Sequence, residues 1–337
     1  MQRSGNSHDG ADAAPHASAL AHGVELADLG VLRVRGADAE RFLQGQLSND
    51  LTRLARESSI LAGLHNPQGR TVALLRLAAT GEHDFLAVLP RALVASVAQR
   101  LSRFILRSKV QVTDESSGWR IRGNVGEQAA MREPSSVREQ PSGGLALAVP
   151  GEPARWIGIV PAAARASESQ TASEAQAASE SHAAALAARN GWRLLDIAAG
   201  LPQIYPQTSE LFVAQMLNLD AIDAISFSKG CYTGQEVIAR AHYRGRVKRR
   251  MQRWRTTAPA ALSPGDSARI ADGRTVRVVD AAQRPDGSCE FLAVAPLAAS
   301  ASTAAGAAAA DEEPAAEPTD KILLEAEQLP LPYGLAS

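Results

Sequence analysis

The sequence predicts an α+β region followed by a small antiparallel β domain. In the first region, short strand-like runs are interleaved with one long amphipathic helix over residues 91–106, a pattern typical of a helix packed on a mostly antiparallel sheet. Residues 251–297 instead carry short β-like runs separated by Gly-Asp and Asp-Gly pairs, which indicates a small barrel or sandwich. Hydrophobic residues make up 45% of the 337 residues, enough to build such cores.

Biased composition marks the segments that lie outside these cores. Residues 1–20 are small and polar, which predicts a disordered tail. Residues 162–188 are rich in Ala, Ser and Glu, and residues 298–319 are rich in Ala and acidic, so both are expected to be insertions that form loops, linkers or frayed helices. We therefore expect an α+β region over 21–250 and a β-barrel domain over 251–337.

The elements of the first region follow from local patterns. Phe42, Leu43 and Leu47 share one face at helical spacing, so a helix is expected after Asp38. The turn between two of the strands is predicted at residues 66–69 (NPQG), because proline suits the second position of a type I turn and glycine the fourth. Strands are expected over residues 30–36, 60–64, 70–77, 84–89 and 109–113. The predicted core face of the long helix consists of Leu93, Val97, Leu101, Phe104 and Ile105.

Charge and cysteine content exclude several classes of protein. The formal net charge is -1, so no global field favours nucleic acid or an anionic membrane. There are two cysteines, Cys231 and Cys289, and no CxxC pair, so zinc or cluster-ligand spacing is absent and no metal site is predicted. A disulfide between them stays open at this point. No apolar run is long enough for a membrane span, and the first residues lack the apolar core of a signal peptide, so a cytoplasmic protein is expected.

One run, residues 226–240 (SFSKGCYTGQEVIAR), carries most of the chemical information. Thr233 and Glu236 form a T-x-x-E capping box, which predicts a helix that begins at Gly234. Glycines at 230 and 234 allow the backbone to approach another group closely. The run is not a phosphate-binding loop, because the glycines are too close together and the lysine precedes them.

Cys231 and Lys229 are the candidate catalytic residues of this run. A cysteine just before a helix N-terminus, with a lysine two residues away, lies where the thiolate is favoured over the thiol. The alternative is a small buried cysteine without chemistry. His242 is the nearest histidine, but nothing in the sequence indicates a Cys–His pair.

A basic segment follows, at residues 243–250 (YRGRVKRR). Three interpretations stay open for its cations: a solvated strand edge that discourages aggregation, a site for an anionic ligand such as a polyglutamate tail, or a surface for single-stranded RNA beside an aromatic residue. The side chains that any nucleic-acid contact would use are Arg244, Arg246, Lys248, Arg249 and Arg250.

Several motifs together resemble the YgfZ family. Residues 229–236 (KGCYTGQE) match its signature, and residues 42–50 (FLQGQLSND) resemble its N-terminal F-L-Q-G-Q-L-T-N-D segment. Residues 66–70 (NPQGR) resemble its N-x-x-G-(R/K) turn. Further similar stretches lie at residues 200–202, 208–213, 215–220 and 331–333.

The resemblance implies a fold and a function. Proteins of this family share the fold of the glycine-cleavage T-protein, in which two ferredoxin-like α+β modules and a C-terminal antiparallel β-barrel form a three-module ring around a central opening for tetrahydrofolate. The implied function is that of a tetrahydrofolate-binding accessory protein for the assembly or repair of iron–sulfur enzymes, with an indirect effect on tRNA thiolation. The expected partners are iron–sulfur client enzymes or cluster carriers, and the expected cofactor is tetrahydrofolate or a derivative.

The resemblance also implies site residues. Cys231 would be a reactive thiol that transiently holds sulfur, iron or a partner's cluster, or forms a mixed disulfide. The residues carried over to the folate site are Gln44, Asn49, Asn66, Glu210, Met216, Asn218, Tyr232, Gln235, Glu236 and Arg240.

One departure from the T-protein argues against aminomethyl transfer. The T-protein carries an acidic pair after its N-x-x-G turn, whereas residues 70–76 (RTVALLR) contain no acid. Without that carboxylate the expected electrostatic and proton-handling group is missing. A folate-dependent one-carbon transferase and a direct tRNA-binding module are the alternatives to an accessory protein without classical turnover.

Overall fold

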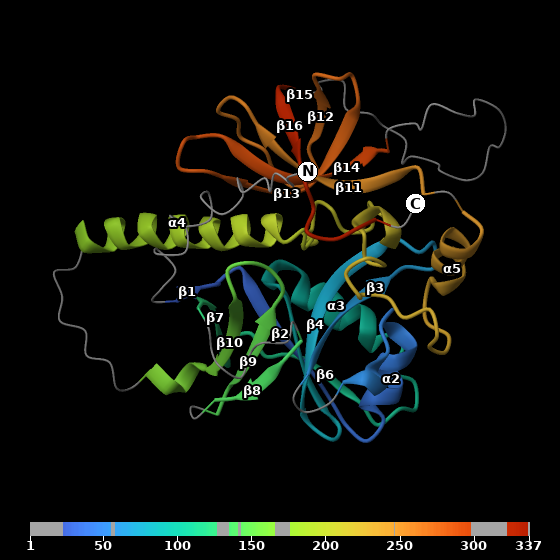
Figure 1. Ribbon diagram of the computed structural model, residues 1–337. Coiled ribbons are helices and arrows are strands. Elements are labelled where there is room, and N and C mark those ends of the chain that lie inside the picture. Colours follow the sequence, from blue (N-terminus) through green and yellow to red (C-terminus); the bar gives the residue numbers. More distant parts are fainter. Residues whose placement is uncertain are drawn as a thin grey trace, which may run out of the picture. The chain divides into compact units, whose positions relative to one another are not determined.

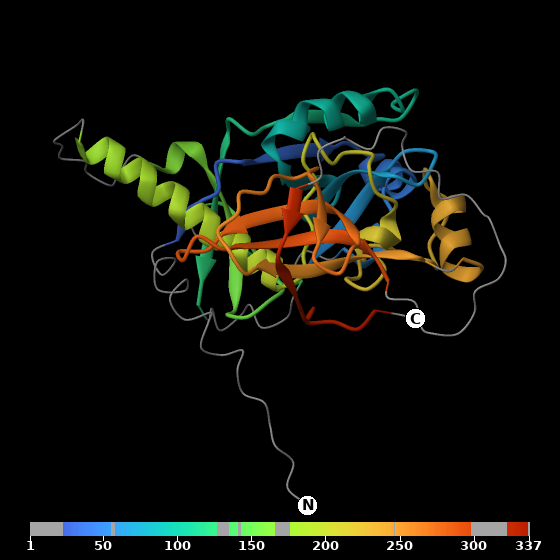
Figure 2. The same ribbon diagram turned by 90° about the horizontal axis from the view of Figure 1, so that it is seen from above.

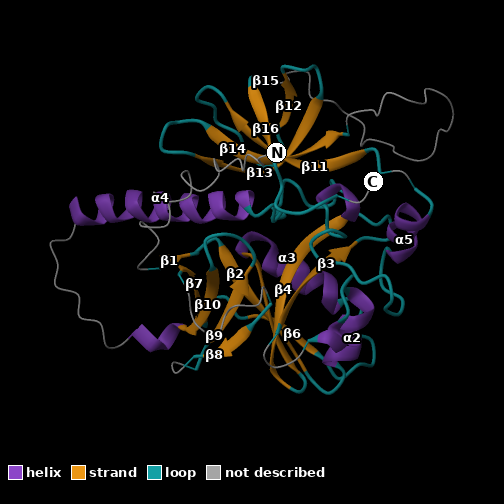
Figure 3. Ribbon diagram, viewed as in Figure 1, coloured by secondary structure: helices purple, strands orange, loops and turns teal. Residues whose placement is uncertain are grey.

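The computed structural model describes residues 23–54, 58–126, 135–140, 143–165, 176–245, 247–297 and 322–335. The predicted tail over residues 1–20 and the acidic insertion over 298–319 lie outside these ranges. Figures 1 and 3 show the chain coloured by sequence and by secondary structure.

One sheet is formed by the strands predicted in the first third of the chain. Its order is β3-β4-β5-β2-β6, and β2 pairs antiparallel with both β5 and β6. Its central strands are almost wholly buried, which explains their continuous apolar runs. The helix α3 packs against β2, β5 and β6 through Leu93, Val94, Val97 and Leu101 (Figure 2). The strands are β2 (Leu29–Arg35), β3 (Ser59–His65), β4 (Thr71–Gly81), β5 (Asp84–Pro90) and β6 (Gln111–Asp114).

The long helix is shorter than predicted. α3 spans Arg91–Ser102, and Arg103 is its C-cap, so Phe104 and Ile105 do not lie on it. Phe104 is 49% exposed, and its amide bonds to the Leu101 carbonyl in a tight turn. The predicted helix end at residue 106 and the core role of Phe104 and Ile105 are therefore wrong, because the chain turns at this point toward β6.

A second sheet has the order β1-β7-β10-β9-β8 and pairs antiparallel throughout. The helix α4 (Gln176–Ala198) contacts this sheet at β1. Gly123 leaves room for the Trp192 ring, because a Cβ there would come within 2.4 Å of a ring carbon. The strands are β1 (Val24–Glu25), β7 (Trp119–Val125), β8 (Val137–Glu139), β9 (Leu145–Val149) and β10 (Arg155–Pro161).

The Ala/Ser-rich insertion over 162–188 is largely helical where it is described. A short 3-10 helix, η2 (Ala162–Arg165), follows β10. The helix α4 begins at Gln176, so its first half lies within the insertion. Alanine has the highest helix propensity of all residues, so a segment without large side chains still forms a helix. The buried Trp192 and Leu195 anchor the second half of the same helix.

The C-terminal strands form a curved sheet of order β15-β12-β13-β14-β11-β16. The predicted runs correspond to β11, β12, β13 and β14, and Gly265, Gly273 and Gly287 have positive φ in the turns that punctuate them. Its core includes Trp254 and Phe291. One pair, β12 with β15, is parallel, so the sheet is not antiparallel throughout. The strands are β11 (Arg249–Thr256), β12 (Ser267–Ile270), β13 (Thr275–Gln283), β14 (Cys289–Pro296), β15 (Ile322–Leu324) and β16 (Ala326–Leu329).

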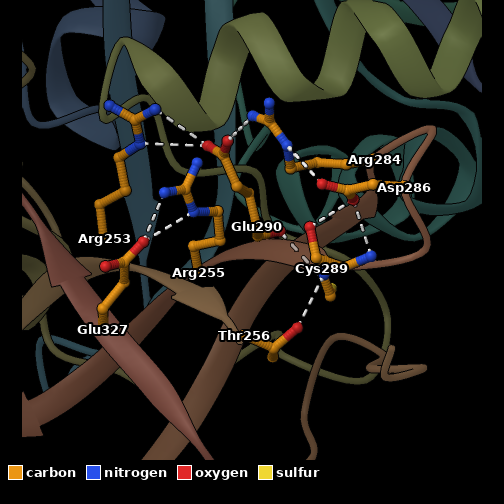
Figure 4. A network of polar contacts seen from close by, with 9 residues as sticks. Arg253, Arg255, Thr256, Arg284, Asp286, Cys289, Glu290 and Glu327 are labelled. Atoms are coloured by element: carbon orange, nitrogen blue, oxygen red, sulfur yellow. Dashed lines mark hydrogen bonds and ion pairs between the residues drawn. The ribbon is translucent and has the colours of Figure 1, made fainter. Parts of the chain in front are cut away.

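A buried carboxylate organises one face of this sheet. Glu290 on β14 lies between the guanidinium groups of Arg253 and Arg284 (Figure 4). Its Oε2 accepts a hydrogen bond of 2.9 Å from Arg253, and its Oε1 forms a short contact with Arg284. Two cations on one carboxylate compensate the desolvation of a side chain that is only 4% exposed.

Within the described residues the chain divides into two compact units. Unit 1 takes in the described parts of Met1–Ala39, Thr52–Ile60 and Arg76–Ala199, and unit 2 takes in Glu40–Leu51, Leu61–Leu75 and Gly200–Ser337. The strands after residue 250 thus group with residues 200–250, and the predicted domain boundaries stay predictions. No helix in the described part of the chain is long and apolar enough to cross a membrane.

The elements that build the candidate site all contribute residues to unit 2. α2 (Ala39–Gln46) is followed by the short helix η1 (Leu51–Arg53). Farther along the chain lie the short helix η3 (Ala214–Leu217) and α5 (Gln235–Tyr243).

Candidate functional site

Of the signature residues, 229–234 form a loop that leads into α5, and 235–236 begin that helix (Figure 1). The loop is anchored at its start by Ser226, whose amide donates to the Ser48 carbonyl at 2.9 Å. The Ser48 hydroxyl in turn donates to the Ala224 carbonyl at 2.7 Å. The residues after α2 thus fix where the loop begins.

Lys229 holds the loop through three backbone carbonyls. Its side chain is buried, and Nζ donates to the carbonyl oxygens of Gln44 at 2.8 Å, Leu47 at 2.7 Å and Asn49 at 2.7 Å. An ammonium group has three protons, so all of its donors are used. Burial lowers the pKa of Lys229 to about 8, which leaves the group mostly protonated at neutral pH.

This geometry gives Lys229 a different role from the one predicted. The sequence placed it two residues from Cys231 as a charge that favours the thiolate. The ammonium group is instead directed at the end of α2 and the residues that follow it. Lys229 is therefore a positioning residue for the loop that carries Cys231.

Tyr232 is buried beside Lys229. The lysine Nζ lies 5.3 Å from the centre of the tyrosine ring, a distance at which a cation is attracted by the ring face. Burial raises the pKa of Tyr232 to about 12. The ring of His65 lies on another side, with the two centroids 6.4 Å apart. The loop is thus fixed by the inward side chains on both sides of Cys231.

Gly234 closes the loop and begins α5. It is the N-cap residue with φ of 82°, and a Cβ there would come within 2.5 Å of the Asn66 carbonyl oxygen. No side-chain hydrogen bond caps α5 in the described structure, so the predicted capping box of Thr233 and Glu236 is wrong. The left-handed glycine occupies the N-cap position that the prediction gave to Thr233.

Cys231 carries the exposed side chain next to the exposed Gly230 of this loop. Both cysteines are free, and they differ in accessibility: Cys231 is exposed, while Cys289 is buried in the C-terminal sheet at 1%. The possibility of a disulfide between them is thereby removed. The loop presents a single accessible thiol on a rigid support.

Four amides predicted for the folate site are engaged in hydrogen bonds within unit 2. Asn49 donates to the carbonyls of Leu61 and Asp223, at 2.9 and 2.7 Å. Gln44 bonds the Asp50 carboxylate and the Leu51 amide, both at 2.8 Å.

The other two amides are similarly engaged. Asn66 accepts from the amides of Gln68 and Arg70, and its Nδ2 donates to Glu210 at 3.0 Å. Asn218 has φ of 57°, and its Nδ2 donates to the Met251 carbonyl at 2.8 Å. All four amides support the backbone around the loop.

The remaining predicted residues are more accessible. Met216, Glu210 and Gln235 are partly buried, while Glu236 and Arg240 are exposed on α5. The structure therefore brings the predicted residues together in one unit, but divides them into internal supports and more accessible side chains, of which Glu210 also accepts the hydrogen bond from Asn66.

No protein-family model matches this chain. A protein of Serratia proteamaculans named tRNA-modifying protein YgfZ is 30% identical over 277 residues, which cover 79% of this chain and 81% of the relative. The chain belongs to the YgfZ family. A Haemophilus influenzae protein named only as uncharacterized is 33% identical over 230 residues, 68% of this chain and 71% of that protein.

A solved structure gives the fold of this YgfZ-family protein. The aminomethyltransferase T of the glycine cleavage system from Bartonella henselae matches with a TM-score of 0.60 at 15% identity, covering 84% of this chain and 81% of that one. The predicted T-protein fold is confirmed. At this identity the match shows the fold alone.

Several supporting residues of this YgfZ-family protein were missed by sequence reasoning. Arg250, named among the cations that a nucleic-acid contact would use, is buried and pairs with both carboxylate oxygens of Asp220, at 2.8 and 2.9 Å. Gln215 on η3 donates to the Ile238 carbonyl of α5 at 2.7 Å. The residues of each pair are distant in sequence. The signal that could have pointed to them was the position of Gln215 and Asp220 in a stretch that resembles the family.

The C-terminus of the chain also supports the site. The Tyr333 hydroxyl donates to the Gly200 carbonyl at 2.8 Å and accepts from Asn218 at 3.4 Å. Burial raises the pKa of Tyr333 to about 12. The closing residues that resemble the family's last strand therefore hold the segment that carries Asn218.

Proposed function

We propose that this protein binds a tetrahydrofolate and acts as an accessory factor for iron–sulfur enzymes, with Cys231 as the residue that contacts the client. The observation that carries the proposal is the rigid signature loop. Lys229 and Tyr232 are buried and fix the backbone, while the cysteine between them is exposed. A thiol held in this way is suited to meet a partner rather than to fill a core.

The accessible residues have the chemistry that folate requires. A carboxylate such as Glu210 or Glu236 suits paired hydrogen bonds to the aminopyrimidine edge of a pterin, and the exposed Arg240 suits the carboxylates of the glutamate tail. Met216 adds a partly buried apolar surface. When bound, the folate would supply a one-carbon carrier or a structural ligand, and these residues would hold and orient it.

The T-protein fold by itself favours the alternative of aminomethyl transfer. Against it stands the first half of β4, where residues 71–75 are buried and apolar apart from Thr71 and no carboxylate occurs through Arg76. The acid that would handle the folate proton is missing at this position. The accessory function is therefore the better supported of the two.

Calorimetric titration of the purified protein with tetrahydrofolate tests the first half of the proposal. Saturable heat is expected for the wild type and for Cys231→Ala, and a weaker response for Glu236→Gln. Glu82→Gln, an exposed carboxylate of unit 1, is the matched control. Absence of saturable binding would remove folate from the function, and glycine-dependent folate turnover would establish the transferase instead.

Client activity tests the second half. In cells that lack the endogenous protein, the activity of an iron–sulfur enzyme is expected to recover with the wild type and not with Cys231→Ala. Full recovery with the variant at equal abundance would show that the thiol has no role.

A further inference from the structure

The C-terminal end of α5 exposes an aromatic cluster. The rings of Phe227 and His242 stack, with centroids 3.7 Å apart and an interplanar angle of 15°. Tyr243 packs edge-on against His242 at 4.8 Å. The Tyr243 side chain is 68% exposed, a large value for an aromatic residue that ends a helix. The cluster thus orders an aromatic ring and leaves much of its surface to solvent.

Cations surround the exposed ring. Arg240 lies three residues before Tyr243 and Arg244 one residue after it, so the three share a face of the helix end. Arg240, Arg244 and Lys248 are exposed, and in the part of the chain that the structure describes their side chains form no ion pair or hydrogen bond. Arg246 lies outside the described residues.

Two cations of the basic segment, Arg244 and Lys248, precede a strand. β11 begins only at Arg249 and pairs with β14 along its length, whereas β16 pairs only with its second half, from Arg253 to Thr256. Arg250 is withdrawn from the surface by its buried pair with Asp220. Arg244 and Lys248 therefore do not lie on a strand.

We propose that the α5 end, defined by Tyr243, Arg240, Arg244 and Lys248, is a binding surface for a single-stranded segment of RNA. An exposed ring offers a stacking platform for a base, and cations without internal partners suit the phosphate backbone. An acidic protein partner would use the cations but would not need an ordered flat ring. This inference goes beyond the proposed folate function, since Arg240 is the one residue of the surface that is also a candidate folate residue, and Tyr243, Arg244 and Lys248 are not.

Fluorescence anisotropy with a labelled oligouridine of about 20 nucleotides at low salt tests the surface. The wild type is expected to bind in the micromolar range, with an affinity that falls as salt is raised. Tyr243→Ala is expected to weaken binding about 5- to 100-fold through lost stacking. The double change Arg244→Glu/Lys248→Glu is expected to weaken it at least about 10-fold and to reduce the salt slope by about 1.4, or 0.7 for each phosphate contact.

A control of equal charge keeps the test specific. Arg103 and Arg107 are exposed in unit 1, so Arg103→Glu/Arg107→Glu changes the net charge equally at a different place. This control is expected to bind RNA within about twofold of the wild type, and every variant to keep its circular dichroism spectrum and tetrahydrofolate titration. The surface is refuted if the wild type does not bind RNA even at about 10 mM salt, where exposed charges are little screened. It is also refuted if the control loses as much affinity as the α5 variants. It is also refuted if polyglutamate displaces the RNA while Tyr243→Ala binds normally, because the site would then recognise an acidic chain.

Discussion

The Nζ atom of Lys229 lies 2.7 Å from the carbonyl oxygen of Leu47, a residue 182 positions earlier in the chain. With the carbonyls of Gln44 and Asn49 it completes a cradle in which each proton of the ammonium group has an acceptor. Two segments that resemble the family's N-terminal and signature motifs thus meet at one charged group. This contact gives a physical reason why a lysine stands two residues before the exposed thiol.

Replacing this lysine should destabilise the protein. Lys229→Met keeps the length of the side chain but removes every donor, which leaves three carbonyl groups without their partner. We expect the free energy of unfolding to fall by about 3 kcal/mol. Urea unfolding measures it, and Lys248→Met, at an exposed lysine, should change it by less than about 0.5 kcal/mol. Equal effects of the two changes would mean that water replaces the ammonium group without loss.

The two glycines of the signature should respond differently to the same substitution. Gly234→Ala places a Cβ within 2.5 Å of the Asn66 carbonyl at a positive φ, so a loss of about 1–3 kcal/mol is expected. A Cβ at Gly230 would meet nothing within 4 Å, and its φ is not positive, so Gly230→Ala should be nearly neutral. Thermal unfolding of the two variants side by side checks the contrast. If Gly234→Ala leaves the thermal stability unchanged, the turn at residues 66–69 can move to make room for the new Cβ.

Local patterns predicted most of the fold for physical reasons. In the C-terminal sheet, Asp-Gly and Gly-Asp pairs mark turns with positive φ at Gly265, Gly273 and Gly287, so the strands between them were visible in the sequence. The NPQG turn is confirmed in the same way, since the Gly69 amide donates to the Asn66 carbonyl at 2.9 Å.

The site was harder to predict because its contacts are not local. The pattern located residues 229–236, but it could not show that the Lys229 ammonium group is directed at residues 44–49 rather than at Cys231. The same holds for Arg250, which reads as one more surface cation until Asp220 is found beside it. The capping box failed because the N-cap position falls on the left-handed Gly234, one residue after Thr233, so Thr233 is not the N-cap.

The buried pair of Asp220 and Arg250 should be far more sensitive than a surface pair. Asp220→Ala leaves a guanidinium group that is about 5% exposed without its carboxylate, and we expect a loss of about 3–5 kcal/mol. Asp272→Ala removes the half-exposed partner of Arg274 and should cost about 0–1 kcal/mol. The double change Asp220→Leu/Arg250→Met should recover most of the loss in urea unfolding. If the double variant is as unstable as Asp220→Ala, the buried charge is not the cause.

The two thiols should differ in reactivity by their burial alone. Iodoacetamide added to the native protein should modify Cys231 and leave Cys289 untouched, whereas both should react in denaturant. Mass spectrometry of intact protein and of its peptides distinguishes the outcomes. Cys231→Ser should remain unmodified in the native state and unfold within about 0.5 kcal/mol of the wild type, because an exposed side chain contributes little to the core. Rapid labelling of Cys289 in the native protein would contradict the buried position in β14.

A buried histidine should make the protein sensitive to acid. His65 is 1% exposed, and neither ring nitrogen has a hydrogen-bond partner in the described structure. Burial lowers the pKa of His65 from 6.5 to about 3, so between these values the unfolded chain binds a proton that the folded chain does not. The contribution of His65 to stability is therefore complete above pH 6.5 and falls by about 1.4 kcal/mol for each pH unit below it.

His65→Leu removes this titration. The unfolding free energy of the variant should depend less steeply on pH between 6 and 4 than that of the wild type, by up to about 1.4 kcal/mol per pH unit. His83→Gln, at a half-exposed histidine, should keep the wild-type slope. Urea unfolding at a series of pH values measures the three slopes. Identical slopes for wild type and His65→Leu would mean that the folded protein accepts a proton at His65. That result would contradict the buried ring without a hydrogen-bond partner in the described structure.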